Sequence, residues 1–214
     1  MRIRITFAKQ GALRYTGHLD LHKLWERAAR RAELPLAYSQ GFHPQPKMTI
    51  AAALPLGFSS RCEVIDMRLE HDVPLDGMQE KLQQTLPTGI QVSNVESVDE
   101  KLPALQTQVA SVEYEVNLTE AVDSSELNQR IDSVMGSESI IRERRGKTYD
   151  LRPLIEELTL TPPSLPEGEG PGVRVFMRLA AREGATGRPE EVLDMLGIAF
   201  EGTRIERTQI IFKS

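Results

Sequence analysis

The side chains best suited to chemistry are concentrated in residues 15–31, YTGHLDLHKLWERAARR. His18 carries an imidazole, a side chain that commonly acts as a general acid or base, and Asp20 places a carboxylate two residues further along. Both groups could therefore exchange protons with a substrate. His18 and His22 also have the i, i+4 spacing of two metal ligands on one helix face. No third ligand follows at a familiar spacing, so we predict no metal site.

The same segment carries a high density of positive charge. At 3.6 residues per turn, the apolar side chains fall on one arc of a helix. The opposite arc holds the cations Lys23, Arg27, Arg30 and Arg31. One interpretation is an ordinary solvated face, with Glu26 paired to Arg30 one turn away. The other is phosphate binding, because the planar guanidinium fork fits phosphate oxygens.

Charge is distributed unevenly along the chain. Residues 1–50 contain nine Lys or Arg and three Asp or Glu, a net charge of +6. The remaining residues contain 17 Lys or Arg and 28 Asp or Glu, a net charge of -11. The whole chain has a formal charge of -5. A basic segment on an acidic body favours a polyanionic partner for one face. We predict that the four helix cations, together with Lys47, bind a nucleic-acid backbone.

A second group of candidate side chains follows in residues 39–47, SQGFHPQPK. Gly41 permits a positive φ, and Pro44 and Pro46 stiffen the chain after it, so the loop should present fixed side chains. We favour packing of Phe42 into the core, with stacking on an unpaired base as the alternative. We predict one pocket that includes residues of this loop and of the helix. Its lining is Tyr15, His18, Asp20, Ser39, Phe42, His43 and Glu63.

Composition limits the class of protein. The 214 residues are 40% hydrophobic and 27% charged, and no apolar stretch could span a bilayer. These values favour a globular cytoplasmic protein without a membrane partner. The single cysteine, Cys62, can form no intrachain disulfide and no multi-cysteine iron–sulfur site. G-x-x-x-x-G-K-[ST], G-x-G-x-x-G and G-x-S-x-G patterns are absent, and we expect no cofactor.

Hydrophobic periodicity predicts an α+β protein. In the first half we expect strands at 2–9, 48–57, 62–69 and 90–98, and helices at 17–33 and 73–86. In the second half we expect strands at 111–118, 139–144, 147–153, 173–180 and 204–212, helices at 124–135 and 188–196, and a Pro/Gly-rich loop at 162–172. This order predicts two tandem ferredoxin-like (βαββαβ) units with antiparallel sheets, at 1–100 and 108–214.

The sequence resembles the radical-SAM-linked (radical-SAM-associated) protein family, a domain of unknown function. The resemblance covers nearly the whole chain. The segments that carry it are LRYTGHLDLHKLWERAARRAELPLAYSQGFHPQPKMT, PLGFSSRCEVIDMRL, LPTGIQV and YDLRPLI. One departure is Gly17, where the family pattern suggests serine. The resemblance implies a domain fused to, or encoded beside, a radical-SAM protein, in a genomic context of RNA processing. This chain lacks C-x-x-x-C-x-x-C, so it could only be the partner.

Three functions are compatible with these residues. The first is a non-catalytic RNA-binding or substrate-presenting accessory protein that works with a radical-SAM partner in RNA modification or processing, with no DNA binding predicted. The second is a protein-interaction domain that binds no RNA. The third is a metal-independent ribonuclease, in which His18 or His43 would take the 2′-hydroxyl proton and Lys47 or an arginine would stabilise the charged transition state. Asp20 is a further candidate catalytic residue. We rank the three in this order.

Overall fold

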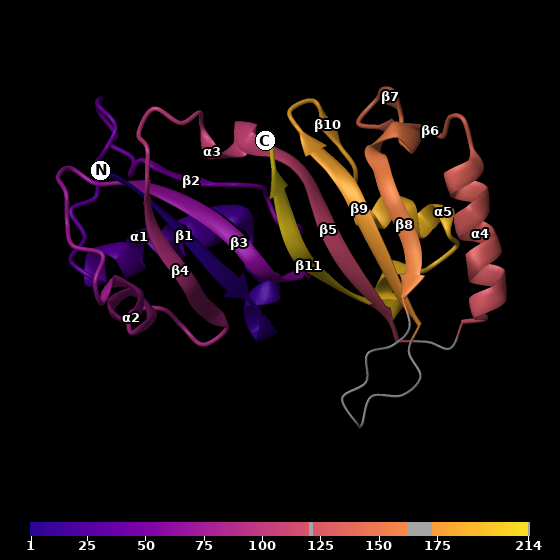
Figure 1. The fold of residues 1–214 in the computed structure, drawn as a ribbon, viewed down its shortest axis with the longest axis horizontal. Helices are drawn as coiled ribbons and strands as arrows, with labels where there is room; N and C mark the ends of the chain where they lie inside the picture. Colours follow the sequence, from indigo (N-terminus) through magenta and orange to yellow (C-terminus); the bar gives the residue numbers. More distant parts are fainter. Residues whose placement is uncertain (120–121, 162–172, 214) are drawn as a thin grey trace. The chain divides into compact units, whose positions relative to one another are not determined.

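A computed structural model of the chain describes residues 1–119, 122–161 and 173–213. The chain divides into two compact units, Met1–Val109 with Lys213, and Ala110–Phe212 (Figure 1). Both units are mixed α/β, with mostly antiparallel strands and few helices. The loop predicted at 162–172 lies outside the described residues. No helix in these three ranges is long and apolar enough to cross a membrane.

The first unit contains four strands, three α-helices and one 3₁₀ helix. In chain order these are β1 (Arg2–Lys9), the 3₁₀ helix η1 (Gly11–Tyr15), α1 (His18–Arg31), β2 (Met48–Ile50), β3 (Ser59–Arg68), α2 (Met78–Gln83), β4 (Ile90–Val98) and α3 (Leu105–Gln108). The strands lie in the order β4–β1–β3–β2, and every neighbouring pair is antiparallel. Strand β1 is therefore central and pairs with β3 and β4 along its length.

The core of the first unit follows from the alternation in β1. Ile3, Ile5 and Phe7 are fully buried and point to the face of the sheet that α1 covers. Trp25 of α1 packs edge-on against Phe7, with ring centroids 4.7 Å apart and an interplanar angle of 62°. Leu21 belongs to the same buried cluster. The apolar arc of α1 thus faces the sheet, and the helix presents its polar arc to solvent.

Two predicted elements of the first unit are shorter than expected. The strand predicted at 48–57 is limited to Met48–Ile50, and the chain then turns at Pro55 and at Gly57, which has a φ of 88°. The helix predicted at 73–86 is limited to Met78–Gln83. Gly77 adopts a left-handed conformation just before it, which a continuous α-helix cannot contain.

The second unit repeats the alternation of strands and helices. In chain order its elements are β5 (Val109–Leu118), α4 (Ser124–Gly136), β6 (Ile141–Arg144), β7 (Lys147–Asp150), the 3₁₀ helix η2 (Arg152–Leu154), β8 (Ile155–Thr161), β9 (Arg174–Arg182), β10 (Ala185–Thr186), α5 (Pro189–Met195), the 3₁₀ helix η3 (Phe200–Gly202) and β11 (Thr203–Phe212). Its main strands lie in the order β8–β9–β5–β11, with β10 also paired to β9. Strands β6 and β7 form a separate hairpin.

Local sequence explains two features of this unit. The hairpin turns at Arg145 and Gly146, with φ values of 51° and 72°, as expected for a two-residue turn with both central residues at positive φ. Helix α4 begins after Asp123, whose carboxylate accepts hydrogen bonds from the N–H groups of Ser125 and Glu126. In Figure 1, α4 runs beside β8.

Candidate functional site

The N-terminal end of α1 is anchored by a buried cation. The side chain of Lys9, at the end of β1, is almost completely buried, and its Nζ donates to the carbonyl of Thr16 at 2.9 Å. Gly17 then caps the helix with extended backbone and no side-chain hydrogen bond. Lys9 therefore fixes the chain immediately before α1. The sequence analysis did not identify this role, although the alternation of β1 places Lys9 on the same face as the buried Ile5 and Phe7.

A groove of about 410 Å³ runs along the polar side of α1. One wall is a stripe of helix residues spaced by three or four positions, as one face of a helix requires. The other wall is the segment that follows α2. The lining residues are Thr16, Asp20, Leu24, Arg27 and Arg31 on one wall and Thr85, Leu86 and Pro87 on the other.

The groove contains two arginines that are available for a ligand. Arg27 and Arg31 are exposed, and neither forms a hydrogen bond or an ion pair with any residue in the described ranges. Arg30, on the same helix, lies outside the groove, with a guanidinium nitrogen 4.0 Å from a carboxylate oxygen of Glu26. The exposed Lys23 also lies outside it. The structure therefore separates the four predicted helix cations into two groove residues and two others.

The histidines of α1 do not line the groove. His18 is exposed in the first turn. The ring of His22 is partly buried, with Nε2 3.3 Å from the carbonyl oxygen of Met48, so it links α1 to β2. The exposed Tyr15 packs against its neighbour Arg14, whose guanidinium lies 4.7 Å from the ring centroid and donates to the phenol oxygen at 2.8 Å.

The loop at 39–47 is closed by hydrogen bonds and not by packing of Phe42. The N–H of Ser39 donates to the carbonyl of Gln45 at 2.8 Å, and the N–H of Gln45 donates to Oγ of Ser39 at 2.9 Å. Phe42 is fully exposed, so the expected packing of this side chain into the core is wrong. The buried Pro46 lies at the base of the loop, whereas His43 is exposed at its tip.

The residues of the predicted pocket are divided among separate places. Of the seven, Asp20 lines the α1 groove, and Ser39, Phe42 and His43 belong to a loop that does not line it. Glu63 is fully buried within β3, where its backbone pairs with that of Phe7.

Lys47 lines a second cavity, of about 260 Å³, together with residues that include Arg2, Asp66 and Arg68.

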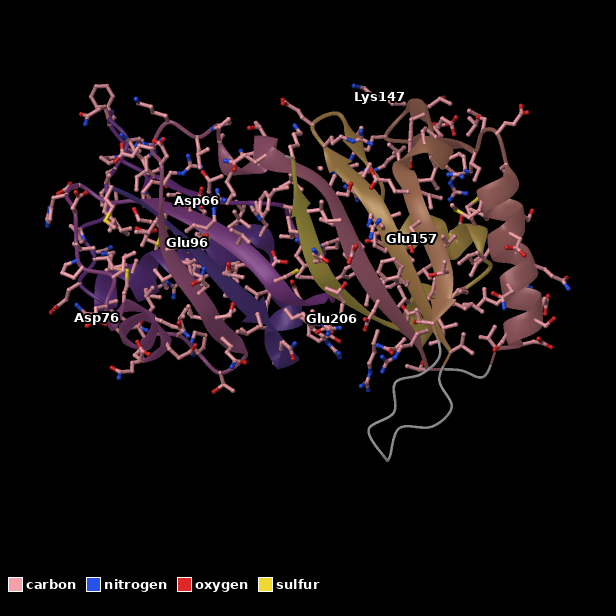
Figure 2. All side chains as sticks on the ribbon, viewed as in Figure 1. Asp66, Asp76, Glu96, Lys147, Glu157 and Glu206 are labelled. Atoms are coloured by element: carbon pink, nitrogen blue, oxygen red, sulfur yellow. The ribbon has the colours of Figure 1, made fainter. Side chains whose placement is uncertain are left out.

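A buried ionic cluster supports the sheet beside this second cavity. Asp66 lies on β3 (Figure 2). Its carboxylate accepts hydrogen bonds from Arg2 Nη2 at 2.6 Å and from Arg4 Nε at 2.8 Å, both on β1. Arg2 also donates to the backbone carbonyls of Leu102 and Pro103. The cluster therefore joins β1, β3 and the segment before α3. Within the described ranges, no three His, Cys, Asp or Glu side chains gather as metal ligands would.

Comparison with known proteins identifies the family of the chain. The model of a family described as "Uncharacterized protein conserved in bacteria (DUF2344)" matches residues 2–189. The chain belongs to this family. No curated protein matches the sequence.

Comparison with solved structures finds similarity at low sequence identity. A chain from "Crystal Structure of a Cbf5-Nop10-Gar1 Complex" has a TM-score of 0.51 and 14% identity, with 97% of this family member covered. A chain from "Structure of H/ACA RNP bound to a substrate RNA containing 2'-deoxyuridine" has a TM-score of 0.44 and 13% identity, with 89% covered. This family member spans about half the length of both chains, 48% and 43%.

Proposed function

We propose that this chain is a non-catalytic accessory protein that binds single-stranded RNA and presents it to a partner. The observation that carries the proposal is the α1 groove, where Arg27 and Arg31 have no partner among the described residues. Guanidinium groups in that state are available to phosphate oxygens, which they bind with two parallel hydrogen bonds. In a chain with a formal charge of -5, such a site stands out from a generally acidic background.

The groove has a composition that suits a nucleotide. Leu24, Leu86 and Pro87 provide an apolar surface between the polar groups. Unstacked bases pack between aromatic or apolar side chains, while the phosphates of the strand bind cations. A volume of about 410 Å³ is within the range of small-ligand pockets, which suits a single nucleotide. The ligand we propose is therefore an unpaired nucleotide within a strand.

Strand order supports a proposal for the finer fold class. The orders β4–β1–β3–β2 and β11–β5–β9–β8 are both those of a split βαβ unit, in which the last strand lies beside the first. We therefore propose that each unit is ferredoxin-like. Because function resides in sites and one fold can host many of them, the RNA proposal depends on the groove and not on this assignment.

A radical-SAM protein is the partner we propose, on the resemblance of the sequence alone. The single cysteine of this chain cannot hold an iron–sulfur cluster, so the cluster would belong to the partner. A pull-down with the tagged chain tests the pairing. Recovery of a radical-SAM protein after nuclease treatment would support direct contact, and its loss after nuclease would indicate tethering through RNA.

Replacing both groove arginines tests RNA binding. We expect Arg27→Gln/Arg31→Gln to weaken binding of a fluorescent single-stranded RNA at least tenfold at low salt, because two phosphate contacts are lost. Each contact to a single strand contributes about 0.7 to the slope of log K against log salt. The slope should therefore fall by about 1.4 in the variant. Fluorescence anisotropy across a salt series measures both quantities.

Lys23→Gln/Arg30→Gln is the matched control for this test. It removes the same charge from the same helix at two positions that do not line the groove. We expect a smaller change in affinity and an unchanged salt slope. Equal effects of the two double variants would show that net charge alone matters. Wild-type affinity in the Arg27/Arg31 variant would exclude the groove as the RNA site.

A further inference from the structure

We infer that Asp20 makes the α1 groove selective for guanine, an inference that rests on the proposed binding of RNA. Asp20 is an acidic residue in the lining, where it shares the groove with Arg27 and Arg31. Its side chain is exposed and, like theirs, has no hydrogen bond or ion pair with any described residue. A carboxylate in a phosphate-binding groove requires an explanation, because it repels the ligand's own charge.

The positions of the charges divide the groove into two parts. Asp20 lies seven residues before Arg27 on the same helix, a separation of about 10 Å along the axis at 1.5 Å per residue. Its Oδ2 is 3.8 Å from the position that a Cβ on Gly17 would occupy, so the carboxylate lies at the N-terminal end of α1. A phosphate is favoured at the arginine end and disfavoured beside Asp20. The base of a bound nucleotide should therefore lie toward Asp20.

Guanine is the base whose Watson–Crick edge best fits a carboxylate. An ionised carboxylate only accepts hydrogen bonds, and its two oxygens can accept from two adjacent donors. Guanine presents N1–H and N2–H₂ side by side, whereas adenine, cytosine and uracil place an acceptor next to each donor. Against those three bases one carboxylate oxygen would face a lone pair. The apolar side chains Leu24 and Leu86 would contact the face of the same base.

A structural role for Asp20 makes a different prediction. A carboxylate in the first turn stabilises a helix through the helix dipole, and Asp20 is in that position. Removing its charge would then lower the stability of α1 and weaken the binding of every RNA to the same degree. Selection of guanine instead requires an effect that depends on the base. The comparison of bases therefore separates the two roles.

Binding of four pentanucleotides to the full chain tests the inference. We expect UUGUU to bind about tenfold more tightly than UUUUU, UUAUU and UUCUU, as one bidentate contact to a base provides. Asp20→Asn should reduce this preference to within about twofold, and the affinity for UUUUU should stay the same or rise slightly, because the carboxylate no longer repels the phosphates. A pentanucleotide with inosine at the central position keeps N1–H and lacks the N2 amino group, so its affinity should be intermediate. Fluorescence anisotropy competition measures all of these values.

Asp76→Asn is the matched control, because it removes the same charge from an exposed position outside the groove. It should retain the preference for UUGUU. Equal affinities for the four pentanucleotides would overturn the guanine inference, and so would an equal loss of affinity for all four in Asp20→Asn. The proposed function would still stand in either case if RNA binding depends on Arg27 and Arg31. Binding that is insensitive to both arginines would overturn the proposed function as well.

Discussion

Asp66→Ala is expected to lower the free energy of unfolding by about 3–5 kcal/mol, because it leaves a buried charge without its partner. Arg2 and Asp66 are each about 4% exposed, and the carboxylate accepts from Arg2 Nη2 at 2.6 Å and from Arg4 Nε at 2.8 Å. Without it, the Arg2 guanidinium keeps only its bonds to the carbonyls of Leu102 and Pro103. Urea denaturation followed by circular dichroism measures the change.

Two further variants make this expectation specific. Asp66→Asn keeps the shape of the side chain and one oxygen acceptor but removes the charge. Its free energy of unfolding should therefore lie between that of the wild type and that of Asp66→Ala. Asp76→Ala is the control, since Asp76 is exposed in the turn before α2, away from Asp66 (Figure 2). Its change should stay within about 0.5 kcal/mol. A similar loss from Asp66→Ala and Asp76→Ala would refute a stabilising role for the cluster.

This cluster shows where sequence reasoning about the fold stopped. The alternation RIRITFAK predicts the strand at residues 2–9, and the structure has it. Arg2 and Arg4 alternate with the buried isoleucines and lie on the opposite face of the strand, where the alternation alone names no partner for them. Their partner Asp66 is more than 60 residues away and becomes a neighbour only through the pairing of β1 with β3. A local sequence pattern predicts that a segment is a strand, but it does not predict which strand pairs with it.

The candidate site has the same limit. Helical periodicity placed Lys23, Arg27, Arg30 and Arg31 on one arc, and it could not distinguish among them. The distinction comes from Thr85–Pro87, the opposite wall of the groove, whose position depends on where α2 ends. The role of Phe42 was likewise inferred from its hydrophobicity, whereas hydrogen bonds between Ser39 and Gln45 close the loop without it. Residue type predicted the chemistry, and tertiary contacts decided which residues share a surface.

The groove also depends on the buried side of α1, which leads to an expectation for Trp25. Trp25→Ala should lower the free energy of unfolding by about 3–5 kcal/mol, because the fully buried indole packs against Phe7 and its removal leaves a cavity. Trp25→Phe should cost much less. Nε1 of Trp25 has no hydrogen-bond partner within the described residues, so the phenyl ring loses contact area but also removes an unsatisfied donor.

Phe42→Ala is the control for Trp25→Ala, since it also replaces an aromatic residue with alanine, at a fully exposed position of the same unit. Its free energy of unfolding should match that of the wild type, and equal losses in the two variants would contradict the packing described above. Arg27 and Arg31 lie on the far side of α1 from Trp25, so Trp25→Ala should still bind RNA at temperatures where it remains folded. RNA binding that is lost while the circular dichroism spectrum stays native would mean that the groove requires a helix position which only the indole maintains.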